Sequence, residues 1–167
     1  NMLNLNKSFI LLGSNLGDRE CLISEAVEQI CKNCGNLIKK SSLYESEPWG
    51  FEADNFFLNQ VILIETSMSA YDLLKELLSI EIRLGRDRIN KYDGYVSRPI
   101  DIDILYYNDL VVDSVDLILP HLRLHQRRFT LLPFCEIASD FVHPITKCSN
   151  MELLSRCDDM SIVRLYK

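Results

Sequence analysis

Hydrophobic positions between residues 8 and 107 alternate between a strand period and a helical period. Helical spacing begins at Asp18, which can cap a helix, and stops at Gly35. A second helical stretch follows Ser69-x-x-Asp72, which resembles a capping box, and ends at Gly85. Between and around these helices the pattern predicts strands at residues 8–12, 37–45, 56–66 and 99–107.

The order of these elements is β-α-β-β-α-β, which is the ferredoxin-like plan with an antiparallel sheet. Beyond it, residues 108–167 read as short strands and helical pieces, expected near 110–112, 117–119, 127–138 and 150–157. Two long polar stretches, 45–55 and 86–98, interrupt the core pattern. Long loops inside a compact domain usually carry function, so we expect both of them to border a site.

Composition bounds the class of protein without deciding its activity. The chain has 167 residues, 47% of them hydrophobic, which suits one compact domain over residues 1–167. A net charge of −6 and a pI near 5.1 argue against a nucleic-acid partner. No apolar run approaches the roughly 18 residues that span a bilayer. No signal peptide is visible, and Asn1 reads as a cloning remnant ahead of Met2.

The six cysteines favour a reducing compartment. With no secretory signal and ample apolar residues, we expect free thiols and a cytoplasmic location. Cys31 and Cys34 form a C-x-x-C, but no second pair with similar spacing completes a zinc site. Two thiols late in a helix are therefore the simpler interpretation of this motif.

The strand predicted at 99–107 carries two carboxylates among apolar residues. Alternation places Ile100, Ile102, Ile104 and Tyr106 on one face and Asp101, Asp103 and Leu105 on the other. Carboxylates at i and i+2 stand roughly 6.5–7 Å apart and repel each other unless a cation lies near them. Magnesium typically takes one or two carboxylates together with water and phosphate oxygens. The alternative is an edge strand with solubilising charges, and the strand alone leaves both open.

Basic residues surround the acidic strand. They are Arg86, Arg88, Arg98, Arg127 and Arg128, with His121 and His125 nearby. Guanidinium groups match phosphate oxygens, so carboxylates for a cation plus several arginines suit a polyphosphate donor. Solvated surface arginines are the alternative for each one singly. A P-loop and the protein-kinase signatures are both missing, and the glycines at 13 and 17 form too short a motif for dinucleotide binding.

The 45–55 loop and the strand after it bring aromatic groups. Trp49, Phe51, Phe56 and Phe57 can stack on a flat heterocycle, and Asn59 can pair with its edge. Because Phe56 and Phe57 point to opposite faces, we expect one of them to be ordinary core. Asn59 lies in an apolar strand, where a buried amide needs partners from a ligand or from backbone.

Nine short motifs in order resemble one known family, the 6-hydroxymethyl-7,8-dihydropterin pyrophosphokinases. The resemblance covers about residues 8–146, and it lies in the motifs as a set because no single one is decisive. The motifs are Gly-Ser-Asn-Leu-Gly-Asp at 13–18, Tyr-Glu-Ser-Glu-Pro-Trp-Gly-Phe at 44–51, Phe57-Leu58-Asn59, Gly85-Arg86-x-Arg88, Arg98-x-Ile100-Asp101-Ile102-Asp103-Ile104-Leu105, Leu119-Pro120-His121, Arg127-x-Phe129, Glu136-Ile137-Ala138 and His143-Pro144.

The resemblance implies a three-layer α-β-α protein, with helices on both sides of the sheet, that moves pyrophosphate from ATP to the pterin and releases AMP. By position, Asp101 and Asp103 look like ligands of two magnesium ions, and Arg86 and Arg98 like arginines that assist transfer. The ATP-binding positions are Glu81, Arg88, Ile104, His121 and Arg127. The pterin-binding positions are Ser46, Trp49, Phe57, Asn59 and Phe129. No dedicated general base is evident.

One segment departs from the family pattern. Between Arg88 and Arg98 the family often has a shorter stretch with Trp-Gly-Pro, which this chain replaces with residues 89–97. Tyr92 or Tyr95 is a candidate to cover the adenine instead. The departure affects how the loop closes and leaves the acidic pair untouched.

A ferredoxin-like binding module is the main alternative. An RNA-binding sheet needs exposed aromatics and a basic face, which the acidic pI opposes. A metabolite-sensing module would have no need of the aspartates and arginines together. Nothing in the sequence demands a dimer, so we expect a monomer whose partners are ATP and the pterin, with neither nucleic acid nor membrane.

Overall fold

The computed structural model describes residues 5–48, 56–85 and 99–167. The first elements are β1 (Asn6–Ser14), α1 (Arg19–Asn33), β2 (Asn36–Lys40), β3 (Tyr44–Ser46), β4 (Phe57–Thr66), α2 (Ala70–Gly85) and β5 (Asp101–Tyr107). They are followed by β6 (Val112–Asp113), β7 (Ile118–Leu119), the 3-10 turn η2 (Leu124–Gln126), α3 (Arg128–Ala138), α4 (Asn150–Ser155) and β8 (Val163–Leu165).

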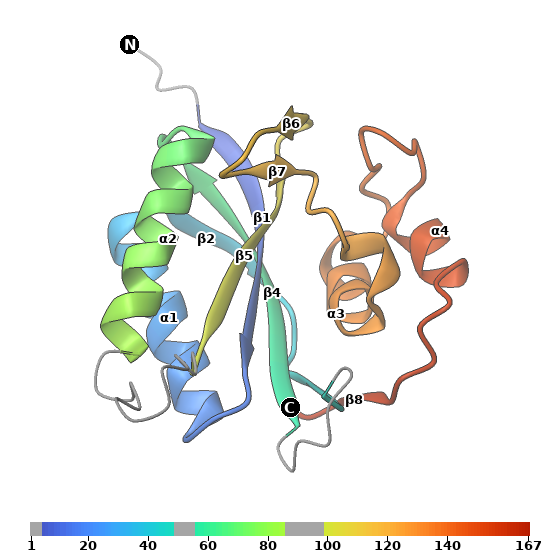
Figure 1. The fold of residues 1–167 in the computed structure, drawn as a ribbon, viewed down its shortest axis with the longest axis horizontal. Helices are drawn as coiled ribbons and strands as arrows, with labels where there is room; N and C mark the ends of the chain where they lie inside the picture. Colours follow the sequence, from blue (N-terminus) through green and yellow to red (C-terminus); the bar gives the residue numbers. More distant parts are fainter. Residues whose placement is uncertain (1–4, 49–55, 86–98) are drawn as a thin grey trace.

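The main sheet is antiparallel, with strand order β5-β1-β4-β3-β8, and β2 also pairs with β4. Helices α1 and α2 cover one face, and α3 and α4 lie on the other (Figure 1). The predicted ferredoxin-like, three-layer arrangement is confirmed. Within the described residues, no helix is both long and apolar enough to cross a membrane.

Side chains at the helix starts explain why the first two helices begin where predicted. The Asp18 carboxylate accepts a hydrogen bond from the Cys21 amide at 3.1 Å, and the Ser69 hydroxyl accepts one from the Asp72 amide at 3.1 Å. Gly35 follows α1 because β4 passes very close. A Cβ at Gly35 would lie 2.0 Å from the Glu65 carbonyl oxygen, so a larger residue would displace backbone.

The strand predicted at 37–45 is two strands, β2 and β3, both paired with β4. The break lies at Ser41, whose hydroxyl accepts from the Val61 amide at 3.0 Å while its carbonyl accepts from the Gln60 side chain at 2.7 Å. These bonds replace ladder pairs that the break removes. Strand β8 was not predicted from the sequence, because its three residues carry little alternation.

A bulge in β5 changes which residues face each layer. Phe9 pairs with Tyr106 and Ile10 with Ile104, so Leu105 is an extra residue in the β1–β5 ladder. The alternation predicted for Tyr106 is therefore wrong. Tyr106 joins Leu105 in the core beneath α3, while Tyr107 continues the face of Ile100, Ile102 and Ile104 toward α1 and α2.

All six cysteines are free thiols. Cys34, the residue directly after α1, is buried, and burial raises the pKa of its thiol to about 11. In the described part of the chain, no group of three or more His, Cys, Asp or Glu side chains could enclose a metal. The C-x-x-C therefore has no described zinc partners.

Candidate active site

Three strands place Asp101, Gly13 and Asn59 in one row across the sheet. Gly13 of β1 pairs with Asp101 of β5 on one side and with Asn59 of β4 on the other. Adjacent strands lie about 4.8 Å apart, so the Asp101 and Asn59 backbones are about 10 Å apart. Gly13 has no side chain, which leaves the floor between them open. Leu11 occupies the next row beside Asp103.

A cavity of about 230 Å³ opens above this floor. It brings together most of the residues predicted to hold the pterin, namely Ser46, Phe57, Asn59 and Phe129. Both aspartates and Arg127 also border it, and Leu11, Gly13 and Glu47 complete the lining. We refer to it as the smaller cavity.

A second cavity of about 510 Å³ lies over α2, β5 and the segment after β7. It contains the described residues predicted to bind ATP, namely Glu81, Ile104, His121 and Arg127. Apolar side chains form much of its rim, including Leu74 and Leu78 of α2 and Ile118 of β7. We refer to it as the larger cavity.

The two cavities meet at three residues. Asp101, Asp103 and Arg127 line both of them. Asp101 is exposed and Asp103 is half-buried, on the strand face that the sequence predicted. A molecule in the smaller cavity and one in the larger cavity would therefore both contact these three charged groups.

Arg127 is held in a way that favours an anionic ligand. Its Nε is buried with no hydrogen-bond partner in the described chain, and its guanidinium lies 5.5 Å from the centre of the Phe129 ring. Burial lowers the pKa of Arg127 from its ordinary value, while the nearby Asp103 carboxylate opposes that shift. A buried guanidinium donor without a partner is costly, and a phosphate oxygen could satisfy it.

His121 faces the larger cavity as a neutral imidazole donor. Burial lowers its pKa from 6.5, although Asp103 acts in the opposite direction. Its Nδ1 accepts a hydrogen bond from the Arg123 amide at 3.2 Å, so the neutral ring carries its proton on Nε2. Its own amide donates to the Leu105 carbonyl at 2.9 Å, which fixes this segment against the outer edge of β5.

Glu81 has a structural partner besides its place in the larger cavity. One carboxylate oxygen of this buried residue accepts from the Ile102 amide at 3.2 Å. Strand β5 lies at the end of the sheet order, so the Glu81 bond satisfies an edge amide that no strand within the described residues pairs. Part of this carboxylate is thus committed to holding β5 beside α2.

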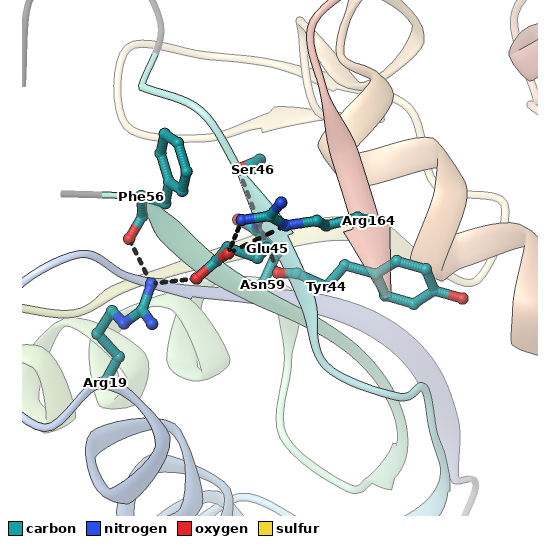
Figure 2. Close-up of polar contacts among 7 residues, drawn as sticks. All are labelled: Arg19, Tyr44, Glu45, Ser46, Phe56, Asn59 and Arg164. Carbon is teal, nitrogen blue, oxygen red and sulfur yellow. Dashed lines mark hydrogen bonds and ion pairs between the residues drawn. The ribbon is translucent and has the colours of Figure 1, made fainter. Parts of the chain in front are cut away.

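Asn59 is fixed by two groups of the neighbouring strand β3. Its Nδ2 donates to the Tyr44 carbonyl at 3.3 Å and to the Ser46 hydroxyl at 2.8 Å (Figure 2). A carbonyl can only accept, so the other amide atom, Oδ1, is the one that points over Gly13. Protein groups thus accept from the Asn59 amide, and a ligand as partner for its Oδ1 stays a prediction.

The aromatic expectation is only partly met. Phe57 is half-buried and lines the smaller cavity, whereas Phe56 is 42% exposed. The expectation that one of the two is ordinary core is therefore wrong. Phe56 precedes β4 and packs its ring against Arg164, 5.7 Å from the guanidinium carbon. Phe129, at the start of α3, supplies an aromatic group from the opposite layer.

Several predicted residues lie outside the described part of the chain. They are Trp49 and Phe51 from the first loop and Arg86, Arg88, Tyr92, Tyr95 and Arg98 from the second. The structure also adds residues that the sequence reading did not assign to a site, including Leu11, Glu47 and Arg123. Leu11 pairs with Asp103 in the β1–β5 ladder, and that pairing is not visible in the sequence pattern.

The acidic pair fits an incomplete magnesium shell. Its donors are hard oxygens on one strand face, and they open toward both cavities. Two carboxylates are too few to enclose an ion, which suits magnesium because it keeps water and takes phosphate oxygens. Arg127 beside the pair would then balance the remaining negative charge of a polyphosphate.

Comparison with known families identifies the class of enzyme. Residues 9–139 match the family model of 7,8-dihydro-6-hydroxymethylpterin-pyrophosphokinase. The chain belongs to this family. It is an ATP-dependent pyrophosphokinase that acts on hydroxymethyldihydropterin in folate biosynthesis.

Curated relatives agree over most of the chain. The 2-amino-4-hydroxy-6-hydroxymethyldihydropteridine pyrophosphokinase of Porphyromonas gingivalis is 40% identical over 144 residues, covering 86% of this chain and 97% of the relative. The enzyme of that name from Bacillus subtilis is 38% identical over 133 residues, covering 79% and 78%. The folic acid synthesis protein fol1 of Pneumocystis carinii is 38% identical over 154 residues, but this chain spans only 20% of it.

Solved structures support the fold of this pyrophosphokinase. The wild-type HPPK-DHPS of Plasmodium falciparum with STZ-DHP superposes with a TM-score of 0.73 at 15% identity. The match covers 92% of this chain and 43% of that one. At this identity the likeness establishes the ferredoxin-like architecture alone.

Proposed function

We propose that the smaller cavity binds the pterin, that the larger cavity binds ATP, and that pyrophosphate passes between them at Asp101, Asp103 and Arg127. The observation that carries this proposal is that both cavities share these three residues. A transfer enzyme must bring donor and acceptor together at the reacting group, and the shared charges mark that point.

In the smaller cavity, shape and polarity suit a flat heterocycle with a polar edge. Phe57 and Phe129 come from the sheet and from α3, so a ring can stack between the layers. Asn59 offers its Oδ1 above Gly13, where it would accept a hydrogen bond from a ring amine or amide. Ser46 holds the Asn59 amide and borders the same space.

In the larger cavity, an apolar rim and a charged floor suit a nucleotide. Leu74, Leu78 and Ile104 provide apolar surface, and the His121 Nε2–H and the Arg127 guanidinium provide donors for phosphate oxygens. Glu81 and Arg88 complete the ATP-binding residues that we propose, the latter from outside the described ranges. Burial and the neighbouring Arg123 lower the pKa of Arg127, while the Asp103 and Asp101 carboxylates raise it, so we expect the guanidinium to keep its charge in this role.

Asp101 and Asp103 would hold magnesium, and we propose two ions, each completed by phosphate oxygens and water. Bound magnesium would neutralise the phosphate oxygens and stabilise charge in the transfer. The chain's own contribution is to hold the pterin hydroxymethyl beside the phosphates and to exclude water. Arg86 and Arg98 assist transfer in this scheme. We further propose a cytoplasmic monomer.

Release of AMP from ATP in the presence of the pterin and magnesium tests this arrangement. Asp101→Asn and Asp103→Asn should each lower kcat by about 100-fold or more, because each removes a carboxylate charge that would hold magnesium beside the transferred group, while keeping the side-chain shape. Asp113→Asn on the exposed strand β6 is the matched control and should match the wild type. Near-normal turnover in both of the first two variants would refute the metal-holding role.

A further inference from the structure

The segment 158–167 contacts both α3 and β3, which carry lining residues of the smaller cavity. It descends from α4, passes α3 and reaches β8 at the edge of the sheet (Figure 1). The family model matches residues 9–139, so the segment lies beyond the part of the chain that defines the family. Its contacts nevertheless fall on the two elements that carry the cavity's lining residues.

The first contact is at the start of α3. One carboxylate oxygen of Asp159 accepts from the Arg128 amide at 2.9 Å, and the other accepts from the Ser161 amide at 3.0 Å. Arg127, the residue before the helix, makes no side-chain capping bond of its own. Asp159 therefore serves as the cap from a distant part of the chain, where a carboxylate also suits the helix dipole. The capped turn carries Arg127 and Phe129.

The second contact is along β3. Val163 and Arg164 of β8 pair with Ser46 and Glu45. Just before β8, the Ile162 amide donates to the Glu47 side chain at 2.9 Å, and the Glu47 amide donates to the Ile162 carbonyl at 3.3 Å. Strand β3 has only three residues, so these bonds supply much of what fixes its position.

The third contact is an ion-pair cluster centred on Glu45. Arg164 approaches one oxygen of this carboxylate at 2.8 Å, and Arg19 of α1 approaches the other at 3.0 Å (Figure 2). The hydrogen bond from Arg164 holds the pKa of Glu45 below its usual value of 4.5. Arg19 also donates to the Phe56 carbonyl at 2.7 Å, and so ties the residue before β4 into the cluster.

We propose that residues 158–167 position the two walls of the smaller cavity for the pterin, with Asp159 fixing α3 and Arg164 fixing β3 through Glu45. This rests on the proposed assignment of that cavity to the pterin. The residues touch neither substrate; they act by holding Ser46, Asn59 and Phe129 at a fixed separation before the ligand arrives. A preorganised site binds more tightly because less order is lost on binding.

Arg164→Met tests the inference against a closely matched control, Arg156→Met. The two side chains are 62% and 68% exposed, and both form ion pairs, but Arg156 pairs with Glu152 on α4 at 4.0 Å. The Glu45 carboxylate is only 12% exposed, so its pair is better shielded than a fully exposed one. We expect Arg164→Met to raise the pterin KM and the calorimetric pterin Kd about three- to tenfold.

The same variant should leave the ATP KM within about twofold of the wild type, because β3, the strand that Arg164 holds through Glu45, carries no lining residue of the larger cavity. Arg164→Lys should restore part of the pterin affinity by keeping the charge. Arg156→Met should match the wild type. Glu45→Gln should weaken pterin binding about as much as Arg164→Met does. The Glu45→Gln/Arg164→Met double variant should lose little more pterin affinity than either single variant.

Two results would overturn the inference. One is a pterin Kd for Arg164→Met equal to that of Arg156→Met; the other is an equal loss for both substrates together with a lowered melting temperature. Asn59→Ala tests the assignment of the pterin to the smaller cavity separately from the positioning role of residues 158–167. If it weakens pterin binding while Arg164→Met does not, the proposed site stands and only the positioning role fails. If Asn59→Ala also binds normally, both fail.

Discussion

Gly13 lies directly opposite Asn59 in the β1–β4 ladder, and a Cβ at Gly13 would stand 3.5 Å from the Asn59 Oδ1. That distance is an ordinary contact, so the backbone itself would tolerate a side chain. The space that such a side chain would fill is the floor of the smaller cavity. We therefore expect a side chain at Gly13 to disturb ligand binding more than the fold.

Substitution at Gly13 should affect the pterin and spare ATP. Gly13→Ala adds one methyl group at contact distance and should cost little. Gly13→Val suits a strand but fills the floor, and we expect about a tenfold or greater rise in the pterin Kd by calorimetry. The ATP Kd should stay close to the wild-type value. Equal pterin affinity in Gly13→Val and the wild type would show that the ring does not lie there.

Both the charge and the planar guanidinium of Arg127 should be needed for activity. Arg127→Met removes the charge between the cavities, and we expect kcat/KM to fall by about 100-fold or more. Arg127→Lys keeps a charge without the planar fork and should recover only part of this loss. Arg123→Met is the comparison, since Arg123 is exposed and borders the larger cavity alone. Similar activity in the Arg127 and Arg123 variants would contradict a central role for Arg127.

Stability should fall in mild acid because of His143. Burial, with a further contribution from His125, lowers the pKa of this residue below 6.5. Its Nδ1 accepts from the Ile145 and Thr146 amides at 3.2 Å each, so a proton there would face two donors. The unfolded chain takes up the proton as pH falls through 6.5 while the folded protein resists it, so the unfolding free energy decreases below that pH.

Urea unfolding between pH 5 and pH 7.5 measures this effect. His143→Asn should reduce the slope of unfolding free energy against pH below 6.5. It should not abolish the slope, because burial also lowers the pKa of His121. An unchanged slope in the variant would rule out His143 as a source of the acid sensitivity.

The core of the fold was readable because its residues obey local rules. Asp18 and Ser69 cap helices through their nearest amides, and Gly35 marks the point where β4 approaches too closely for any side chain. Asp101 and Asp103 share the predicted face because they precede any irregularity in β5. Local periodicity is a sound guide as long as the pairing is regular.

The failures have non-local causes. Tyr106 changed face because β1 and β5 shift register at Leu105, which only the partner strand reveals. Ser41 breaks a strand because the Gln60 side chain, distant in sequence, replaces backbone pairing. Asp159 caps a helix that begins 31 residues earlier, and no spacing rule connects such positions. Phe56 was misjudged because its packing partner, Arg164, comes from the unpredicted strand β8.

The bulge at Leu105 lies in the β1–β5 ladder, where the register of pairing decides which residues face each layer. A slip of one residue in the β1–β5 pairing would exchange the faces of the aspartates and isoleucines. The carboxylates of Asp101 and Asp103 would then turn toward the apolar layer under α1 and α2, where an unpaired charge is very costly. The two carboxylates thus raise the free energy of a misregistered β1–β5 pairing. The charges proposed for catalysis therefore also favour the correct register of the strand that carries them.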